Sequence, residues 1–417
     1  MSEQPLSPAP LEAVRRIESL DLLRGFAVLG ILIMNIQSFS MPDPAYFNPT
    51  TYGDLTGINL AVWAASHLFA EMKLMSIFSM LFGAGIVLFC RRIESQGRSP
   101  APAHYRRILW LLLFGLLHAY LLWTGDILVW YAESGLIAYL FWRARPGTLL
   151  FWSLLLLLIG TGLYVLFQWS LRYWPPEAIQ GIKHWWIPGQ EIIARRLEVY
   201  RGGWLVQMSE RVPGSLMLQT FIYAIYGLWR TLGLMLAGMA LFKWGVLSGE
   251  KSRSFYAVVA AAGLAIGLPI IAYGAWKNFA NDWSVYYSMY GGTLFNYWGS
   301  LFVAVAYISL VNLWGAGSSF GGVKRSLIAV GRMAFSCYIA QTLICTTLFY
   351  GHGFGLFGYI PRWGQLCIVP AVWIVIAAGA RFWMKRYRFG PLEWLWRTLT
   401  YMKQVPMRNS PLPAHGS

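Results

Sequence analysis

A histidine and two carboxylates stand close together in the stretch Leu117–Gly135 (LHAYLLWTGDILVWYAESG). His118 precedes a Gly-Asp turn by seven residues and Glu133 follows Asp126 by seven, so a helical hairpin would hold His118 and Glu133 at matching depth. At 1.5 Å of rise per residue, His118 lies roughly 10 Å from the end of its helix. A carboxylate beside an imidazole orients the ring and supports its use as a general base. We therefore interpret His118 as a candidate general base polarised by Asp126 or Glu133, and a histidine satisfied by core contacts as the alternative.

A second group of ionisable residues, His67, Glu71 and Lys73, stands where the chain enters its second apolar segment. The i, i+4 spacing of His67 and Glu71 fits a hydrogen-bonded pair, and it fits equally well two side chains at a membrane surface. We expect Lys73 to extend outward, so that its ammonium group lies near the surface. Together with Arg230, near the middle of the sixth apolar segment, Lys73 is a candidate for substrate binding or for stabilising an oxyanion.

Asp21 and Arg24 form a third group, at the start of the first apolar segment. Their i, i+3 spacing predicts a pair on one helix face, and a carboxylate is favoured in the first turn of a helix. One interpretation is a helix cap with an anchoring arginine. The other is a cationic seat for a phosphate-bearing ligand. Asn35, near the other end of this segment, is a candidate for binding substrate or for bridging two helices.

The composition indicates that lipid surrounds the elements that position these groups. The 417 residues are 57% hydrophobic and 12% charged, whereas about a quarter of a soluble domain is charged. A helix of roughly 20 apolar residues crosses a bilayer. Such windows predict an all-α, polytopic membrane helix bundle of about ten transmembrane helices, at Leu20–Phe39, Met72–Cys90, Ile108–Thr124, Ile127–Trp142, Thr148–Tyr173, Phe221–Phe242, Phe255–Trp276, Met289–Leu313, Leu327–Tyr350 and Trp363–Trp383.

Lysine and arginine gather in alternate loops, with Arg91–Arg107 the richest. By the positive-inside rule these loops, both termini included, are cytoplasmic. The net charge of +16 is therefore explained by membrane orientation, and we expect no nucleic-acid partner. We divide the chain into a cytoplasmic segment 1–19, a transmembrane domain 20–383 and a cytoplasmic tail 384–417 with an interfacial helix. The outer loop 175–219 predicts an amphipathic surface helix. A bacterial plasma membrane is the expected location.

The sequence contains no motif that predicts a metal site or a soluble catalytic module. The four cysteines lie in apolar stretches without CxxC spacing, so we expect buried thiols and no metal. No Walker A, GxGxxG, HExxH or GxSxG pattern stands in a fitting context.

Several stretches resemble a family of bacterial membrane proteins, the YeiB-like proteins known as domain of unknown function 418. The resemblance runs in order along almost the whole chain, and the matching stretches are Arg16–Asn35 (RIESLDLLRGFAVLGILIMN), Lys73–Gly85 (KLMSIFSMLFGAG), Leu117–Gly135, Arg230–Leu247 (RTLGLMLAGMALFKWGVL), Gly331–Gln341 (GRMAFSCYIAQ) and Gly390–Trp396 (GPLEWLW).

The SLDxLRG…MN opening is also similar to the first helix of the wider transmembrane acyltransferase group, which includes the heparan-glucosaminide acetyltransferases. That resemblance implies transfer of an acyl group from cytoplasmic acyl-CoA to a hydroxyl or amine on the far side. It places Arg24 on the CoA side and matches Asn35 to the asparagine that closes the motif. The glucosaminide enzymes carry a histidine in the first outer loop, whereas Ser40–Gly57 contains none. His118 is our substitute for that histidine, on the physical argument above.

The leading hypothesis is therefore an acyltransferase that uses acyl-CoA as co-substrate and an envelope glycan or lipid as acceptor. His118 would act on the acceptor, Asn35, Lys73 or Arg230 would stabilise the oxyanion, and the Arg91–Arg107 loop would attract the CoA phosphates. The alternative is a transporter or flippase of a small or lipid-linked substrate, in which the same charges line a path. Transporters often carry internal repeats, and this sequence shows no fixed-period repeat. A structural or regulatory membrane protein without chemistry is the third possibility.

Overall fold

A computed structural model describes residues 17–408 of the chain. Helices account for all of the elements in this part, apart from an isolated bridge between Tyr387 and Arg408. The all-α prediction is confirmed. The elements are α1 Glu18–Ser40, α2 Pro44–Phe47, α3 Gly57–Phe69, α4 Lys73–Glu94, α5 Ala101–Leu121, α6 Leu128–Ala138, η1 Tyr139–Phe141, α7 Pro146–Ser170, η2 Leu171–Tyr173, α8 Pro176–Trp186, α9 Gln190–Arg201, α10 Met208–Met217, η3 Leu218–Gly227, α11 Leu228–Lys243, α12 Arg253–Ala280, α13 Val285–Ser288, α14 Thr293–Gly315, α15 Gly321–Arg332, α16 Ala334–Phe349, α17 Arg362–Arg386 and α18 Pro391–Tyr401.

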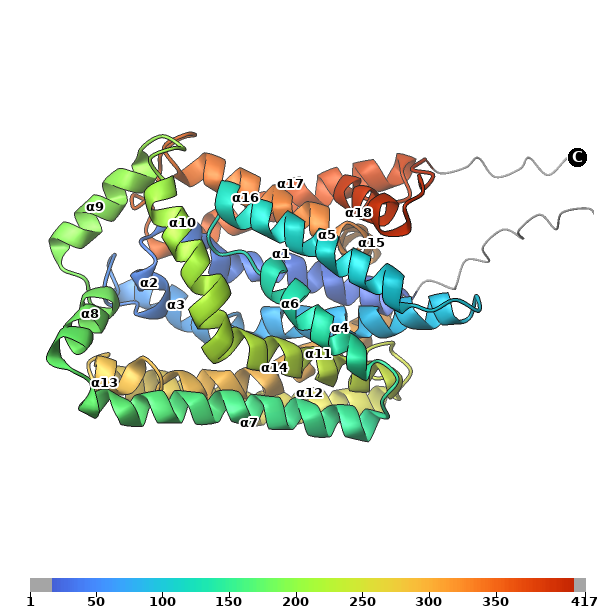
Figure 1. Cartoon of the computed structure of the whole chain (residues 1–417), viewed down its shortest axis with the longest axis horizontal. Helices are drawn as coiled ribbons and strands as arrows, with labels where there is room; N and C mark the ends of the chain where they lie inside the picture. Colours follow the sequence, from blue (N-terminus) through green and yellow to red (C-terminus); the bar gives the residue numbers. More distant parts are fainter. Residues whose placement is uncertain (1–16, 409–417) are drawn as a thin grey trace, which may run out of the picture.

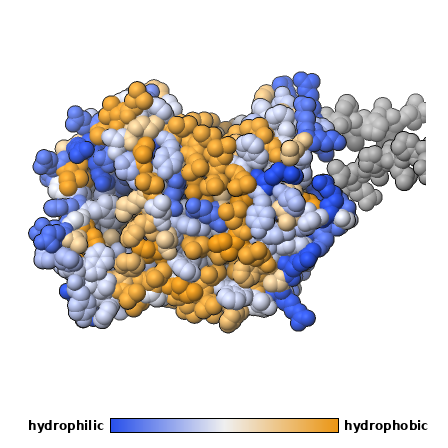
Figure 2. Space-filling view, in the orientation of Figure 1, coloured by the Kyte–Doolittle hydropathy of each residue, from blue (hydrophilic) through white to orange (hydrophobic). Residues whose placement is uncertain are grey.

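Seven helical segments of the described chain are long and apolar enough to cross a membrane, or eight if the bent pair α15–α16 counts as one. On the face shown in Figure 2, apolar side chains form a band across the middle of the molecule, with hydrophilic residues toward both ends. The protein is therefore a multi-pass membrane protein. Each of the ten predicted windows falls on a helix, but α5 is less apolar and α6 with η1 is short. The count of ten stays a prediction.

Helix α1 runs through the middle of the bundle and packs against α4, α15, α16 and α17 (Figure 1). Helix α11 packs between α4 and α7, and α12 pairs with α14. Two glycines allow α4 and α11 to touch. A Cβ on Gly83 would lie 2.0 Å from the Met235 carbonyl oxygen, and one on Gly238 would lie 1.9 Å from that of Met80. Small residues of this kind let membrane helices approach closely, and here they bring α4 and α11 together.

The basic loops and both described chain ends lie at the same end of the bundle, which we call the basic end (residues 91–107, 143–145 and 243–253, with α18). The Ser19 hydroxyl donates to the Leu247 carbonyl there, and Arg106 donates to the Thr400 carbonyl. Helices α8 and α9 cover the opposite end (Figure 1). This arrangement fits the predicted sidedness, although which end faces the cytoplasm stays a prediction. Parts of the two predicted terminal segments, residues 1–16 and 409–417, lie outside the described residues.

Three details differ from expectation. The loop 175–219 forms α8, α9 and α10 instead of a single helix, and α10 continues through η3 into α11 as one 36-residue segment. The predicted span Leu327–Tyr350 bends by 92° between α15 and α16. The Cys367 thiol belongs to an exposed residue on α17, whereas the other three cysteines are buried. An apolar window fixes neither a bend nor the face that a side chain occupies.

Candidate functional site

His118 and Asp126 form a buried pair at the tip of the α5–α6 hairpin. The His118 Nδ1 lies 2.7 Å from the Asp126 Oδ1, and the two side chains are almost fully enclosed. The second carboxylate oxygen accepts the backbone N–H of Val129 at 2.8 Å, so it caps the first turn of α6. A Cβ on Gly115 would lie 2.7 Å from the Val129 nitrogen, so a glycine is needed for α5 to meet α6 here. The predicted partnership of His118 with Asp126 has the geometry of a hydrogen bond.

The other ring nitrogen of His118 faces a hydroxyl from a distant helix. His118 Nε2 lies 2.9 Å from Thr342 Oγ1 on α16. With Nδ1 donating to the Asp126 carboxylate, Nε2 of the neutral ring is an acceptor. The Thr342 hydroxyl can donate to it at 2.9 Å, and the same hydroxyl lies 3.4 Å from the Tyr338 carbonyl oxygen. Trp123 and Tyr338 lie against the imidazole ring, and Thr342 is 1% exposed. An aligned carboxylate, imidazole and hydroxyl in a site closed to water is the arrangement of general-base catalysis.

Glu133 does not join this group. It lies half-buried on α6, and its Oε2 is a buried atom that has no hydrogen-bond partner in the described part of the chain. Of the two partners left open by the sequence, the geometry selects Asp126. Asn35 is likewise apart: it is partly exposed on α1, and no hydrogen bond of its side chain is found among residues 17–408.

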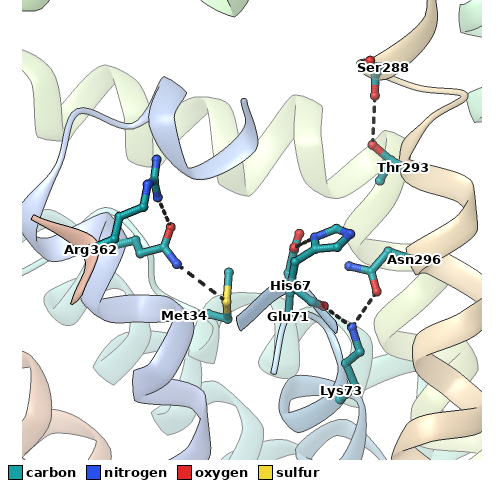
Figure 3. A network of polar contacts seen from close by, with 9 residues as sticks. Met34, His67, Glu71, Lys73, Ser288, Thr293, Asn296 and Arg362 are labelled. Atoms are coloured by element: carbon teal, nitrogen blue, oxygen red, sulfur yellow. Dashed lines mark hydrogen bonds and ion pairs between the residues drawn. The ribbon is translucent and has the colours of Figure 1, made fainter. Parts of the chain in front are cut away.

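Lys73 is the centre of a second buried network (Figure 3). Its ammonium donates to the His67 carbonyl at 2.5 Å and to Asn296 Oδ1 at 2.8 Å, and the Glu71 carboxylate pairs with the His67 ring. Lys73 is 0% exposed, so the prediction that it extends to the surface is wrong. The physical reason is a break between α3 and α4. Met72 has a left-handed backbone (φ 65°), and α4 begins directly after it, with Lys73 inside the bundle.

Arg230 lies in the same region and is also 0% exposed. Its guanidinium donates to the Tyr297 carbonyl at 2.8 Å and to the hydroxyls of Ser76 at 3.0 Å and Ser300 at 2.8 Å. Asn296, the partner of Lys73, directly precedes Tyr297 on α14. The structure thus brings two predicted substrate-binding residues to one junction of α4, α11 and α14.

Asp21 and Arg24 form the predicted pair, at 3.2 Å, toward the basic end. The same end carries a cavity of about 580 Å³, and the Arg143–Glu94 ion pair lies in its wall at 2.5 Å. None of His118, Asp126 and Thr342 lines it. The lining residues are Glu94, Gly97, Arg98, Ser99, Pro100, Tyr139, Leu140, Trp142 and Arg143.

Sequence reasoning missed Thr342 and the specific pairing of Asn296 with Lys73, and it did not single out Arg362, a buried cation outside both groups. Arg362 is buried at the start of α17 and donates to Gln37 Oε1 at 2.7 Å (Figure 3). A polar residue in an apolar stretch was the available signal for each, and that signal does not identify a partner. Among the described residues, no three His, Cys, Asp or Glu side chains are grouped to hold a metal ion.

The comparisons with known proteins agree with one another. The model of a family described as "Protein of unknown function (DUF418)" matches residues 241–403. The chain is 35% identical to the uncharacterized protein YeiB of Escherichia coli (strain K12), with 94% of this chain and 98% of that protein covered. It is 31% identical to the uncharacterized protein YxaH of Bacillus subtilis (strain 168), with 94% and 96% covered. No solved structure matches it.

Proposed function

The chain belongs to the DUF418 family of YeiB-like membrane proteins, and we propose that it is a membrane-embedded acyltransferase. The donor is cytoplasmic acyl-CoA, and the acceptor is a hydroxyl or amine on an extracytoplasmic glycan or lipid. The observation that carries the proposal is the buried Asp126–His118 pair with its second ring nitrogen facing a hydroxyl. Any buried histidine needs partners for its two nitrogens, and a carboxylate on one with a hydroxyl on the other is the set that general-base catalysis uses.

In the proposed reaction His118 Nε2 takes the proton of the acceptor hydroxyl as its oxygen attacks the thioester carbonyl. The new bond joins the acceptor oxygen to the acyl carbon, and the C–S bond breaks. The imidazolium then returns its proton to the CoA thiolate. Asp126 holds the ring in the tautomer that leaves Nε2 free to accept, and it stabilises the transient imidazolium. Low exposure of the pair keeps water from competing for the acyl group.

Thr342 has a positioning role in this proposal. Its hydroxyl occupies the place beside Nε2 that the acceptor hydroxyl takes during turnover. Between turnovers, the Thr342–His118 contact also joins α16 to α5. The acceptor therefore replaces one hydrogen bond with another of the same kind, at little cost in free energy.

The basic end is the proposed docking region of the donor. The cavity lined by Arg98 and Arg143 is of the size that small-molecule sites have, and its charge suits the CoA phosphates. Arg24 lies toward the same end. From Arg107 to His118 the helix α5 covers roughly 16 Å, which is the distance the acyl arm has to bridge. This geometry requires the basic end to be cytoplasmic, in a bacterial plasma membrane.

A transporter or flippase is the second candidate, and the buried cations Lys73 and Arg230 favour it. Purified protein in nanodiscs, supplied with radiolabelled acetyl-CoA and an envelope extract, distinguishes the two. An acyltransferase releases CoA thiol and labels an acceptor. A transporter does neither, yet moves its substrate across a sealed proteoliposome.

A further inference from the structure

The network around Lys73 contains donors that have no acceptor. Arg230 Nε and Asn296 Nδ2 are buried atoms that lack a hydrogen-bond partner in the described part of the chain. Both residues are almost fully enclosed, at 0% and 3% exposure. Most buried polar groups in proteins are hydrogen-bonded, and leaving a buried donor unsatisfied is unfavourable because it has lost its hydrogen bond to water. Two such donors beside a lysine are therefore unusual and call for an acceptor.

The charge around these donors is also unbalanced. Lys73 and Arg230 are close enough for their charges to repel each other, and Glu71 is the carboxylate that attracts Lys73. That carboxylate is already hydrogen-bonded to the His67 ring. Arg230 is bonded to a carbonyl and two hydroxyls, and its guanidinium lies 4.5 Å from the centre of the Tyr297 ring, so all of these partners are neutral. A buried cation without an opposite charge is strongly unfavourable, so the junction carries a positive charge that a ligand can neutralise.

The amino-terminal ends of two helices add positive potential at this junction. Lys73 opens the 22-residue helix α4, and Asn296 lies in the first turn of the 23-residue helix α14. The amino-terminal end of a helix carries a partial positive charge and favours anions. Both helix starts therefore add to the potential produced by the two side chains.

The network can be approached from the end of the molecule opposite the basic end. The side chains of His67 and Glu71 are 11% and 19% exposed, whereas Lys73 below them is enclosed. Tyr46, on α2 outside the membrane-spanning helices, lies near the same carboxylate. Burial raises the pKa of its phenol, and the charge of Glu71 raises it further. The partly exposed His67–Glu71 pair thus lies beside Lys73 and Asn296, which are enclosed (Figure 3).

We propose that Lys73, Arg230 and Asn296 form a binding site for an oxyanion, the carboxylate or phosphate group of a ligand that enters from this end. One ligand oxygen accepts from Arg230 Nε and another from Asn296 Nδ2, while the Arg230 guanidinium and the neighbouring Lys73 ammonium supply the positive charge. Neither His118 nor Thr342 takes part, so the site does not depend on the acyltransferase proposal. Its ligand is either a free oxyanion or the phosphate of a lipid headgroup.

Thermal unfolding of the full-length protein, followed by tryptophan fluorescence, tests the proposal. The protein is reconstituted in phosphatidylcholine nanodiscs and titrated with inorganic phosphate, against sodium chloride of equal ionic strength. A second sample uses phosphatidylglycerol nanodiscs without phosphate. A ligand that binds only the folded state raises the Tm in a saturable way. We expect such a rise with phosphate, with phosphatidylglycerol, or with both, and the pattern identifies the source of the oxyanion.

Asn296→Asp is the decisive variant, because it replaces Nδ2 by a carboxylate oxygen, which supplies a negative charge beside Lys73 and removes a donor that has no partner in the described part of the chain. We expect its Tm without phosphate to equal or exceed that of the wild type and the phosphate-induced rise to be lost. The matched control is Asn312→Asp on the same helix, where Asn312 is buried and donates to the Val246 and Ile308 carbonyls. That variant should lower the Tm and keep the phosphate response.

Lys73→Met gives a second test that adds no negative charge. It should raise the phosphate concentration needed for half of the Tm rise at least tenfold. Three outcomes would overturn the proposal. The first is a wild type whose Tm responds to neither phosphate nor phosphatidylglycerol. The second is an Asn296→Asp variant whose Tm falls as far as that of Asn312→Asp. The third is a phosphate response that is unchanged in Lys73→Met. The readout contains no acyl donor, so failure here is distinct from failure of acyl transfer.

Discussion

The Nδ1 of His118 lies 2.7 Å from Oδ1 of Asp126, while the other oxygen of the same carboxylate accepts the Val129 N–H at 2.8 Å. One side chain thus orients the imidazole and caps helix α6. The two roles respond differently to substitution, because a cap requires only an acceptor whereas the tautomer of His118 requires an acceptor at Nδ1. The relationship therefore allows a functional role of Asp126 to be distinguished from a structural one.

Asp126→Asn should separate these roles. The amide oxygen can still accept from Val129, but the amide NH₂ donates to Nδ1 and forces the ring into the other tautomer. We expect CoA release to fall by roughly 10²- to 10⁴-fold, with less than about 1 kcal/mol lost in the free energy of unfolding. Asp126→Ala removes the cap as well and should cost about 1 kcal/mol more. An Asp126→Asn variant that keeps wild-type activity, or that loses as much stability as Asp126→Ala, would contradict the account.

Thr342 should be dispensable for chemistry if the acceptor hydroxyl replaces it at Nε2. Thr342→Val keeps the shape of the side chain and removes the hydroxyl, so turnover should stay within about tenfold of the wild type. A Thr342→Val variant as inactive as one that lacks the histidine would instead make Thr342 the nucleophile. Intact-protein mass spectrometry after incubation with acetyl-CoA checks this directly, because a nucleophilic threonine would retain the acetyl group.

Arg98 and Arg143, which line the cavity at the basic end, should affect the donor and not the chemical step. We expect Arg98→Gln with Arg143→Gln to raise the KM for acetyl-CoA about tenfold while kcat changes little, since the phosphates are bound equally in the ground and transition states. The effect should shrink as salt is added. Arg172→Gln, in η2 at the far end of α7, is the matched control. A KM that rises equally in Arg172→Gln would indicate a general charge effect.

The α4–α11 contact should tolerate no side chain at Gly83. A Cβ there would lie 2.0 Å from a backbone oxygen, so Gly83→Ala forces the helices apart and strains the positions of Ser76 and Arg230. Overpacking typically costs about 1–3 kcal/mol or more. Gly162→Ala, on the outer face of α7 with no atom near its Cβ, should be neutral or slightly stabilising. Thermal unfolding of the two variants measures the difference, and equal Tm values would contradict the packing described here.

Local spacing made part of the candidate site predictable. The i, i+3 spacing of Asp21 and Arg24 and the hairpin that carries His118 and Asp126 both appear in the structure as predicted pairs. Contacts between distant segments were not predictable. Thr342 meets His118 across 224 positions, and Asn296 meets Lys73 across 223. The residues near Lys73 in the sequence do not indicate that Asn296 of α14 will accept a hydrogen bond from its ammonium. Without such an acceptor a lysine is expected at the surface, and that was the prediction.

The bend after Arg332 was hidden for a related reason. Hydropathy adds the contributions of a window and does not register direction, whereas the break depends on a distant partner. Glu393 of α18 accepts the backbone N–H groups of Phe335 and Ser336, which begin α16. That capping contact satisfies the first turn of α16 and lets the helix start there. Burial raises the pKa of the Glu393 carboxyl, and hydrogen bonds from Ser336 oppose the rise.

The most direct measurement is acyl transfer by His118→Ala in nanodiscs, with radiolabelled acetyl-CoA as donor and an envelope extract as acceptor. The account predicts that the wild type releases CoA thiol and labels an acceptor. It also predicts that the rate of His118→Ala is lower by at least about 100-fold, which is the scale of general-base catalysis. The Tm of this variant should show that it is still folded. Unchanged turnover in His118→Ala would remove the histidine from the mechanism. A wild type that releases no thiol and labels no acceptor would contradict the acyltransferase proposal itself.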